Sequence, residues 1–185
     1  MSDLETIISM LSFRRPADSA SELEFIKKFV VPTGAQRDKY GNWCLNIGDA
    51  PTVLWSSHTD SVHRSEGYQN VDFDGKYITL AVNSKSNCLG ADCAAGVWIM
   101  TEMINAKIPG MYIFHYGEEI GCRGSRAIAQ HEPGRLVNIK AAIAFDRKGI
   151  DSVITSQRGR CCSDTFGNSV AAQLPSATGS IRPAF

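Results

Sequence analysis

The chain has 185 residues, of which 43% are apolar, and this suits one compact domain with a substantial core. Its 19 lysines and arginines balance 19 aspartates and glutamates, so it lacks the basic excess that gathers nucleic acid or an anionic membrane. No apolar run approaches the roughly 20 residues of a membrane span, and the acids after Met1 argue against a signal peptide. We therefore expect a cytoplasmic protein with no nucleic-acid partner and no membrane partner.

Two amphipathic segments open the chain, and both predict helices. Apolar side chains recur at helical spacing over residues 4–11 and again over 23–29, the second behind Ser19 or Ser21 as the N-cap. A hairpin is predicted next, with its turn at residues 39–42 and its returning strand over 43–47.

Short apolar runs then alternate with helical stretches, which predicts an α/β fold with buried strands. The predicted strands cover residues 52–57, 111–115, 141–145 and 152–156, and the predicted helices cover 94–106, 125–130 and 163–174. Residues 175–180 predict a loop leading to another element. Residues 181–185 stop before such an element can form, and Pro183 excludes a regular helix and disfavours a central strand.

The first polar segment after a predicted strand contains His58 and Asp60. Open α/β sheets place their ligand sites at such strand ends, and residues two apart share one side of an extended segment. A carboxylate beside an imidazole is the usual device that orients a zinc ligand. Taken alone, this motif is ordinarily a pair of solvent-exposed loop residues with no metal.

Asp92 opens the Ala-rich helix shortly after Gly90. An acid at a helix N-terminus is ordinarily a cap, but the glycine lets the backbone come close to a ligand. In that second interpretation the carboxylate of Asp92 is placed to bridge two metal ions.

Glu118 and Glu119 follow the strand at 111–115, and Asp146 follows the strand at 141–145. Adjacent carboxylates beside a buried strand repel each other unless one points into water. A divalent metal removes the conflict if one glutamate ligates it and the other acts as general base on its water. For Asp146 the ordinary interpretation is an ion pair with a basic neighbour. Together the four segments supply oxygen and nitrogen donors suited to zinc.

The order of these segments resembles that in the co-catalytic dizinc exopeptidases, the superfamily of zinc aminopeptidases and glutamate carboxypeptidase-like hydrolases. The resemblance covers about residues 50–147. It is carried by Ser57-His58-Thr59-Asp60, Leu89-Gly90-Ala91-Asp92, Gly117-Glu118-Glu119-Ile120-Gly121 and Ala144-Phe145-Asp146-Arg147.

The resemblance implies a metal centre with two zinc ions, for which cobalt or manganese can substitute. It implies that His58 and Asp146 bind one ion, and that Asp92 bridges to a second ion, which Glu119 also binds. It further implies that Asp60 orients His58. Hydrolysis of a peptide or small amide substrate is then expected, by an exopeptidase that is aminopeptidase-like.

The general base in this resemblance is Glu118, which takes a proton from the metal-activated water before attack on the peptide carbonyl. Two departures from the family pattern matter. Cys93 stands where the family often has a second acid, and no histidine follows Asp146, although the family takes a ligand for its second metal from one. We interpret His63 as a rim residue, His115 as a core histidine and His131 as a solvent-facing residue at a helix end.

Too few residues follow Asp146 for the lid domain of the carboxypeptidase branch. We therefore expect a three-layer sandwich in which helices flank a central mixed, mostly parallel β-sheet, without a lid. Residues 1–185 would form a single zinc-exopeptidase-like catalytic domain whose C-terminal element is missing. We expect this form to hold at most one zinc ion tightly, to have low peptidase activity that a longer form restores, and to be marginally stable or form a homo-oligomer.

Three alternatives stay open at this point. A deacylase or carboxypeptidase would use the same metal chemistry but require a free substrate carboxylate rather than a free amine. A catalytically inactive domain kept for binding or assembly is the second. In the third, thiolates of Cys122, Cys161 and Cys162 join the metal ligands, although the scattered cysteines, without CxxC spacing, are expected to be mostly buried thiols.

Overall fold

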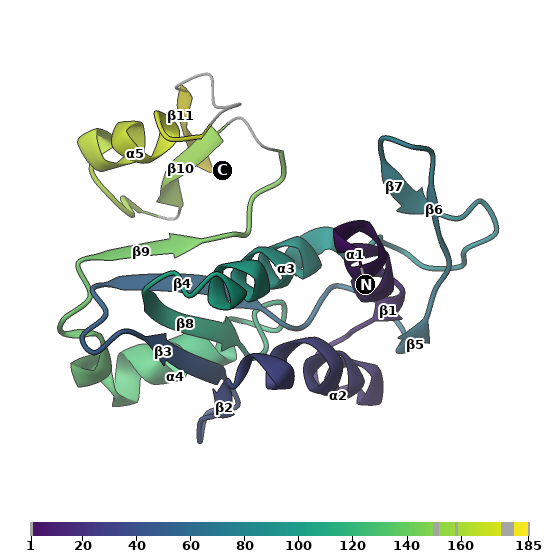
Figure 1. The fold of residues 1–185 in the computed structure, drawn as a ribbon, viewed down its shortest axis with the longest axis horizontal. Helices are drawn as coiled ribbons and strands as arrows, with labels where there is room; N and C mark the ends of the chain where they lie inside the picture. Colours follow the sequence, from purple (N-terminus) through teal and green to yellow (C-terminus); the bar gives the residue numbers. More distant parts are fainter. Residues whose placement is uncertain (1, 150–151, 158, 175–179, 185) are drawn as a thin grey trace. The chain divides into compact units, whose positions relative to one another are not determined.

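The computed structural model describes residues 2–149, 152–157 and 159–174, together with the backbone of 180–184. The chain falls into two compact units, Met1–Asp146 and Arg147–Phe185. The first unit contains a five-stranded sheet with helices on both faces (Figure 1). The expectation of a single catalytic domain over residues 1–185 stays a prediction.

The first unit has four α-helices and several shorter helical turns among its described residues. The α-helices are α1 (Asp3–Leu11), α2 (Ala20–Phe25), α3 (Ala91–Asn105) and α4 (Arg123–His131). The shorter turns are the π-helical Ile26–Val30 and the 3₁₀ segments Val31–Thr33 and Pro133–Leu136. No helix in the described part of the chain is long and apolar enough to cross a membrane.

The two N-terminal helices begin at serine caps, for reasons that are visible in the sequence. The hydroxyl of Ser2 accepts a hydrogen bond from the backbone of Glu5, whose carboxylate accepts one from the backbone of Ser2 in return. Of the two candidate caps for α2, the structure uses Ser19, whose hydroxyl accepts from the backbone of Glu22. The π-helical turn after α2 extends this helical region to Val30.

The central sheet has the strand order β2-β3-β8-β4-β9. Its strands are β2 (Gln36–Arg37), β3 (Trp43–Ile47), β4 (Val53–His58), β8 (Gly110–His115) and β9 (Ala141–Ala144). β4 pairs in parallel with β8 on one side and with β9 on the other, whereas β3 runs antiparallel to both of its neighbours. The predicted α/β fold with a central mixed sheet is therefore confirmed, and the end of β4 lies between the ends of two parallel strands.

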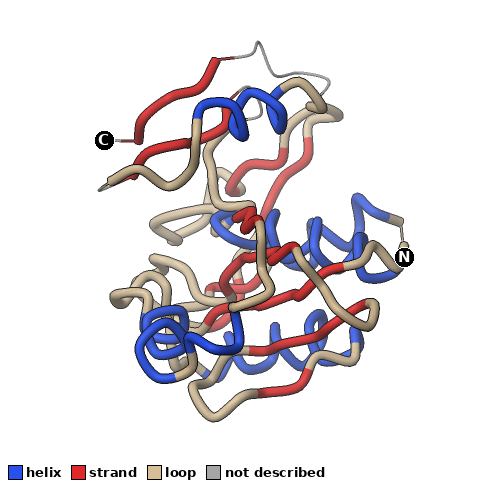
Figure 2. The backbone as a smooth tube through the Cα atoms, turned by 90° about the vertical axis from the view of Figure 1, so that its left-hand side faces the viewer, coloured by secondary structure: helices blue, strands red, loops and turns tan. Residues whose placement is uncertain are grey.

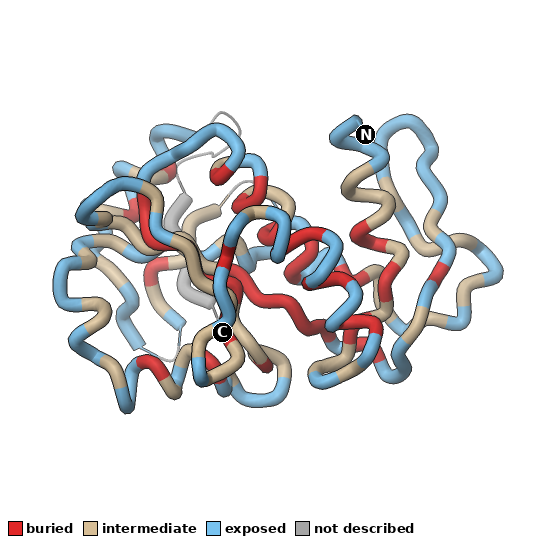
Figure 3. The backbone as a smooth tube through the Cα atoms, turned by 60° about the horizontal axis from the view of Figure 1, so that its bottom comes forward, coloured by how far each residue is buried: buried red, intermediate tan, exposed pale blue. Residues whose placement is uncertain are grey.

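Alternate residues of β8 build two apolar cores, one on each face of the sheet. Tyr112 and Phe114 lie in the larger core with residues of α1, α2 and α3. Met111 and Ile113 lie in the smaller core, against Ile128 of α4. Successive strand residues point to opposite faces, so an unbroken apolar run needs cover on both sides. Figure 3 shows the buried backbone running through the interior of this unit.

The start of α3 packs directly against the ends of two strands because Gly96 has no side chain. A Cβ at this position would overlap the carbonyl oxygen of Phe145 and the sulfur of Cys93, and would lie 3.1 Å from Cβ of Ser57. The helix therefore carries Asp92 close to the edge of the sheet where β4 and β9 end.

Replacing Gly96 by alanine should lower the free energy of unfolding by about 1–3 kcal/mol, because a methyl group has no room against backbone atoms. Gly134→Ala is the matched control, since nothing lies within 4 Å of a Cβ at Gly134. Urea titration of both variants measures the difference. Equal effects of the two substitutions would show that the close packing of α3 is not what Gly96 provides.

Two small strand pairs beside the sheet were not predicted. They are β1 (Phe13–Arg14) with β5 (Gly67–Tyr68), and β6 (Val71–Phe73) with β7 (Ile78–Leu80). The signal for the second pair was present in the sequence, because apolar and polar residues alternate on either side of Asp74-Gly75. The carboxylate of Asp74 caps this turn by accepting hydrogen bonds from the backbones of Lys76 and Tyr77.

The second unit consists of β10 (Ser152–Gln157), α5 (Asp164–Ala171) and β11 (Ser180–Ala184), with the two strands parallel (Figure 2). β11 corrects the expectation that the chain stops before another element forms. Proline is tolerated in edge strands and at irregularities, and Pro183 pairs with Ser156 where the register shifts. Of the predicted loop at residues 175–180, residues 175–179 lie outside the described residues, and Ser180 begins β11.

Candidate metal centre

The four predicted motifs meet at the carboxyl edge of the sheet. His58 is the last residue of β4, Asp146 follows β9, and Asp92 lies in the first turn of α3. Glu118 and Glu119 follow β8, the other neighbour of β4. Parallel strands bring their carboxyl ends to one edge, so segments that are up to 88 positions apart in the sequence converge on His58.

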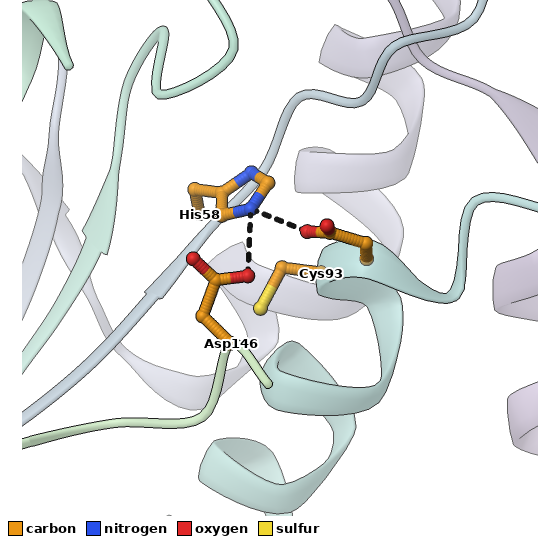
Figure 4. A group of neighbouring side chains, drawn as sticks. His58, Cys93 and Asp146 are labelled. Atoms are coloured by element: carbon orange, nitrogen blue, oxygen red, sulfur yellow. Dashed lines mark hydrogen bonds and ion pairs between the residues drawn. The ribbon is translucent and has the colours of Figure 1, made fainter. Parts of the chain in front are cut away.

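His58 lies at the centre of a first group of donor atoms, which Figure 4 shows. Its Nε2 atom is 2.8 Å from Oδ1 of Asp92 and 3.5 Å from Oδ1 of Asp146. Cys93 Sγ belongs to the same group, whose ligand atoms all lie within 4.8 Å of one another. The structure thus brings together the three residues predicted to hold the first zinc ion.

Asp60 is fully buried and connects His58 to the loop after β8. Nδ1 of His58 is 3.1 Å from the carbonyl oxygen of Asp60 and 3.3 Å from its Oδ1. The two carboxylate oxygens of Asp60 accept hydrogen bonds from the backbones of Glu118 and Glu119, each at 3.0 Å. The contact with His58 is the one predicted for an orienting residue. The sequence did not indicate the second contact, which holds both glutamates in place.

Glu118 and Glu119 form a second group of donor atoms with His58, again within 4.8 Å of one another. Burial, followed by the negative charge of Asp92, raises the pKa of Glu119 to about 7. The thiol of Cys122 donates a hydrogen bond to Oε1 of Glu118 at 3.4 Å.

The electrostatics of His58 reflect its carboxylate surroundings. Burial alone would lower the pKa of His58, but hydrogen bonds to Asp146, Asp60 and Asp92 outweigh it and raise the pKa far above its ordinary value. Hydrogen bonding to His58 in turn lowers the pKa of Asp92, which is only partly opposed by burial. A positive charge at the centre of this group is therefore strongly favoured.

These residues fit a zinc ion. Imidazole nitrogen and carboxylate oxygen are ligands that zinc accepts, and the carboxylates of Asp92, Glu119 and Asp146 all belong to groups that include the His58 ring. Burial and then the negative charge of Asp92 raise the pKa of Glu119, and a bound divalent cation would offset the cost of ionising this carboxyl group. Solvent reaches the centre at Asp92, whose side chain is 66% exposed, while that of His58 is 2% exposed.

Three buried polar residues that support the centre were missed in the sequence. Arg15 and Glu22 contact Thr59, which lies between His58 and Asp60. No periodic pattern marked Arg15, because it lies in the connection between α1 and α2. The sequence placed Glu22 in a helix, but the fact that it is buried depends on the packing of that helix.

Asn42 is the third missed residue, and it supports the loop after β8. Its Oδ1 accepts a hydrogen bond from the backbone of Tyr116 at 3.1 Å, and its Nδ2 donates to the carbonyl of Gly124 at 3.3 Å. The predicted hairpin turn that carries Asn42 thus holds both ends of the segment containing Glu118. A turn residue gives no sequence signal for such a distant contact.

The other histidines belong to neither of the two donor groups. His63 is not the expected rim residue, because it is buried and its ring contacts Ser61, Gln69 and the Cys88 carbonyl. His115, at the end of β8, lies 3.4 Å from Oδ1 of Asn42, and burial lowers its pKa to about 4. His131 ends α4, as expected for a residue at a helix end, and stacks on Tyr40.

The cysteines differ from the expectation of mostly buried thiols. Only Cys93 is buried, Cys161 is exposed, and the other four are intermediate. Cys161 and Cys162 belong to the second unit and, like Cys122, to neither donor group of the described residues. The thiol of Cys93 donates a hydrogen bond to the carbonyl of Phe145 at 3.0 Å.

Comparison with known proteins gives a family and a set of similar structures. A model of the peptidase family M28 matches residues 44–166. A comparison with curated protein sequences finds no match.

Several solved structures are similar to the chain over most of its length. A tripeptidase from Staphylococcus aureus has 20% sequence identity and a TM-score of 0.62, covering 83% of this chain and 45% of its own. The aminopeptidase PepT from Bacillus cereus has 22% identity and a TM-score of 0.63, and the match covers 83% of this chain and 45% of PepT. The LapA aminopeptidase from Legionella pneumophila has 18% identity and a TM-score of 0.56, and the match covers 96% of this chain and 55% of LapA. The chain therefore spans about half the length of these proteins.

Proposed function

Because this chain belongs to peptidase family M28, we propose that it is a zinc-dependent exopeptidase domain of the aminopeptidase type. The observation that carries the proposal is the convergence of His58, Asp92 and Asp146 at one edge of the sheet, with Glu118 and Glu119 beside them. The substrate would be a peptide or a small amide with a free N-terminal amine. The side chain of Asp92 is exposed, which allows such a substrate to approach it.

Four residues would hold the metal. His58, Asp92 and Asp146 supply the first position, and Asp92 and Glu119 supply the second. Zinc bound there lowers the pKa of water and polarises a carbonyl group. Three protein ligands would hold the first ion and two would hold the second, so we expect one zinc ion to be bound tightly and a second weakly.

The remaining chemistry belongs to side chains of this chain. Glu118 would take the proton of the attacking water and pass it to the leaving amine, as a general base and then a general acid. Asp60 would keep Nδ1 of His58 in its donating form, so that Nε2 faces the metal position. By accepting hydrogen bonds from both glutamate backbones, Asp60 also fixes the position of the base relative to the ligands.

Chelation and reloading of the purified chain test this proposal. The chelated protein is titrated with zinc, cobalt and manganese, and hydrolysis is followed on aminoacyl-chromophore substrates and on N-acyl amino acids. We expect one tight zinc ion per chain and slow hydrolysis of the free-amine substrates alone, which chelation abolishes and zinc restores.

Each other outcome contradicts a stated part of the proposal. Hydrolysis of the N-acyl substrates alone would favour a deacylase or carboxypeptidase. Zinc binding without hydrolysis of either panel would favour a binding domain. Failure to bind any of the three metals would contradict the proposed metal centre itself.

A further inference from the structure

A buried arginine joins the two backbone segments that carry the metal-site residues. The side chain of Arg15 is 0% exposed, and its two terminal nitrogens donate hydrogen bonds to the carbonyls of Thr59 and Gly90, both at 2.6 Å. Thr59 separates His58 from Asp60, and Gly90 lies two residues before Asp92. One guanidinium group therefore holds the His58 segment and the Asp92 segment at a fixed separation.

Every polar atom of Thr59 makes a hydrogen bond. Its backbone nitrogen donates to the carbonyl of His115 at 3.2 Å, and its carbonyl accepts from Arg15. Its hydroxyl donates to Oε1 of Glu22 at 2.6 Å, and the other oxygen of Glu22 accepts from the backbone of Asp18 at 2.8 Å. The residue between His58 and Asp60 is thus fastened to the N-terminal segment as well as to the sheet.

The backbone of Arg15 makes further contacts with the same loop. Its carbonyl accepts hydrogen bonds from the backbone nitrogen of Ser61 at 2.8 Å and from the Ser61 hydroxyl at 3.1 Å. Its nitrogen donates to Nδ1 of His63 at 3.2 Å. The loop also approaches the second segment closely, because a Cβ at Gly90 would lie 2.5 Å from Cε1 of His63. The two segments and Arg15 therefore pack as one unit.

The arginine stays charged in this environment. Burial lowers the pKa of Arg15 to about 10, still well above neutral pH, and the negative charge of Glu22 acts in the opposite direction. The guanidinium carbon lies 4.3 Å from the ring centroid of Phe25, a cation–π contact that orients the planar group. Arginine suits this position because its planar fork presents two donors in a fixed geometry, which a lysine ammonium does not.

We propose that Arg15 is a positioning residue for the metal centre, which fixes the separation between the His58 and Asp92 ligands by holding Thr59 and Gly90. This inference rests on the proposed metal-dependent function. Arg15 and Glu22 lie outside residues 44–166, the segment that the family model matches, so the family match assigns neither of them a role. The N-terminal segment thus supplies part of the metal site without contributing a ligand.

The test is zinc affinity in Arg15→Met, Arg15→Lys and the neighbouring control Arg14→Met. Arg14 donates to the hydroxyl of Ser65 and does not contact Thr59 or Gly90 through any described hydrogen bond. Groups that orient metal ligands without binding the metal typically contribute 10-fold to 100-fold in affinity. We therefore expect Arg15→Met to weaken zinc binding by about 10-fold to 100-fold, and Arg15→Lys to recover part of the loss. Arg14→Met should bind zinc as the unaltered chain does.

A second readout separates positioning from a general loss of stability. The visible spectrum of the cobalt-loaded protein reports ligand geometry, and it should change in Arg15→Met but not in Ile128→Val. Ile128 lies in the smaller core, so its truncation lowers the unfolding midpoint without touching the site. If Arg15→Met does not fold, the comparison rests on Arg15→Lys against Arg14→Lys.

The outcomes distinguish this inference from the proposed function. If folded Arg15→Met keeps the zinc affinity and the cobalt spectrum of the unaltered chain, the positioning role is wrong, but the proposed metal centre is not contradicted. If only Arg15→Lys folds, the same result in that variant leads to the same conclusion. A chain that binds no zinc before any substitution would overturn the proposed function itself. If Arg15→Met and Ile128→Val lose zinc affinity to the same extent, Arg15 contributes only to the stability of the fold.

Discussion

Replacing Asp92 by alanine should empty the metal centre. Asp92 is the carboxylate shared between the two proposed metal positions, and its Oδ1 lies 2.8 Å from Nε2 of His58. Its loss removes a ligand from each position at once, so zinc affinity should fall by more than the roughly 10-fold to 100-fold typical of groups outside the ligand set. Zinc content after dialysis and calorimetric titration of chelated protein measure the change.

The matched control for this prediction is Asp72→Ala. Asp72 is an exposed aspartate in β6 that belongs to neither donor group. It should retain the zinc content and affinity of the unaltered chain. An Asp92→Ala variant that binds zinc as tightly as the control would show that the ion is held elsewhere, and the proposed ligand set would then be wrong.

Replacing Glu118 by glutamine should lower turnover by about 10²-fold to 10⁴-fold while leaving the metal in place. The amide keeps the shape of the side chain and its backbone hydrogen bond to Asp60, but it cannot accept the proton of the attacking water. The measurement is kcat in a metal-loaded form of the protein with measurable activity, together with zinc content in the same samples.

Two other glutamates serve as comparisons for this variant. Glu119→Gln should chiefly weaken the second metal position, because Glu119 is the proposed ligand there. Glu132→Gln should change neither property, since Glu132 pairs with Lys39 on the surface. Normal turnover in Glu118→Gln would assign the general base to another residue.

Much of the fold could be predicted from the sequence because the signals are local. Continuous apolar runs marked β4, β8 and β9. The expected burial on both faces holds for the interior strand β8, whereas Ala142 and Ala144 of the edge strand β9 are exposed. The serine before α2 marked its start, since the hydroxyl satisfies a free backbone N–H. Two-residue strands such as β1 are too short to show a period, and the proline in β11 argued against the strand that forms there.

The residues of the two candidate donor groups could also be predicted in large part, because most of them lie at a strand end or open a helix. The motif order indicated the exopeptidase resemblance, which the match to peptidase family M28 confirms. The roles of Asp60, Glu118 and the four metal ligands stay predictions. The experiments on Asp92 and Glu118 address them directly.

The sequence by itself indicated the candidate donor residues, since His58, Asp92, Glu119 and Asp146 are readable as donors at strand and helix ends. Only the tertiary structure decided what holds them in place. Arg15 reaches Gly90, which lies 75 positions away in the sequence, and Asp60 reaches the loop after β8. These are contacts of buried polar groups with distant backbone atoms. Such contacts leave no period in the sequence, because the hydrogen-bonding partner is any carbonyl or N–H that the fold brings within reach.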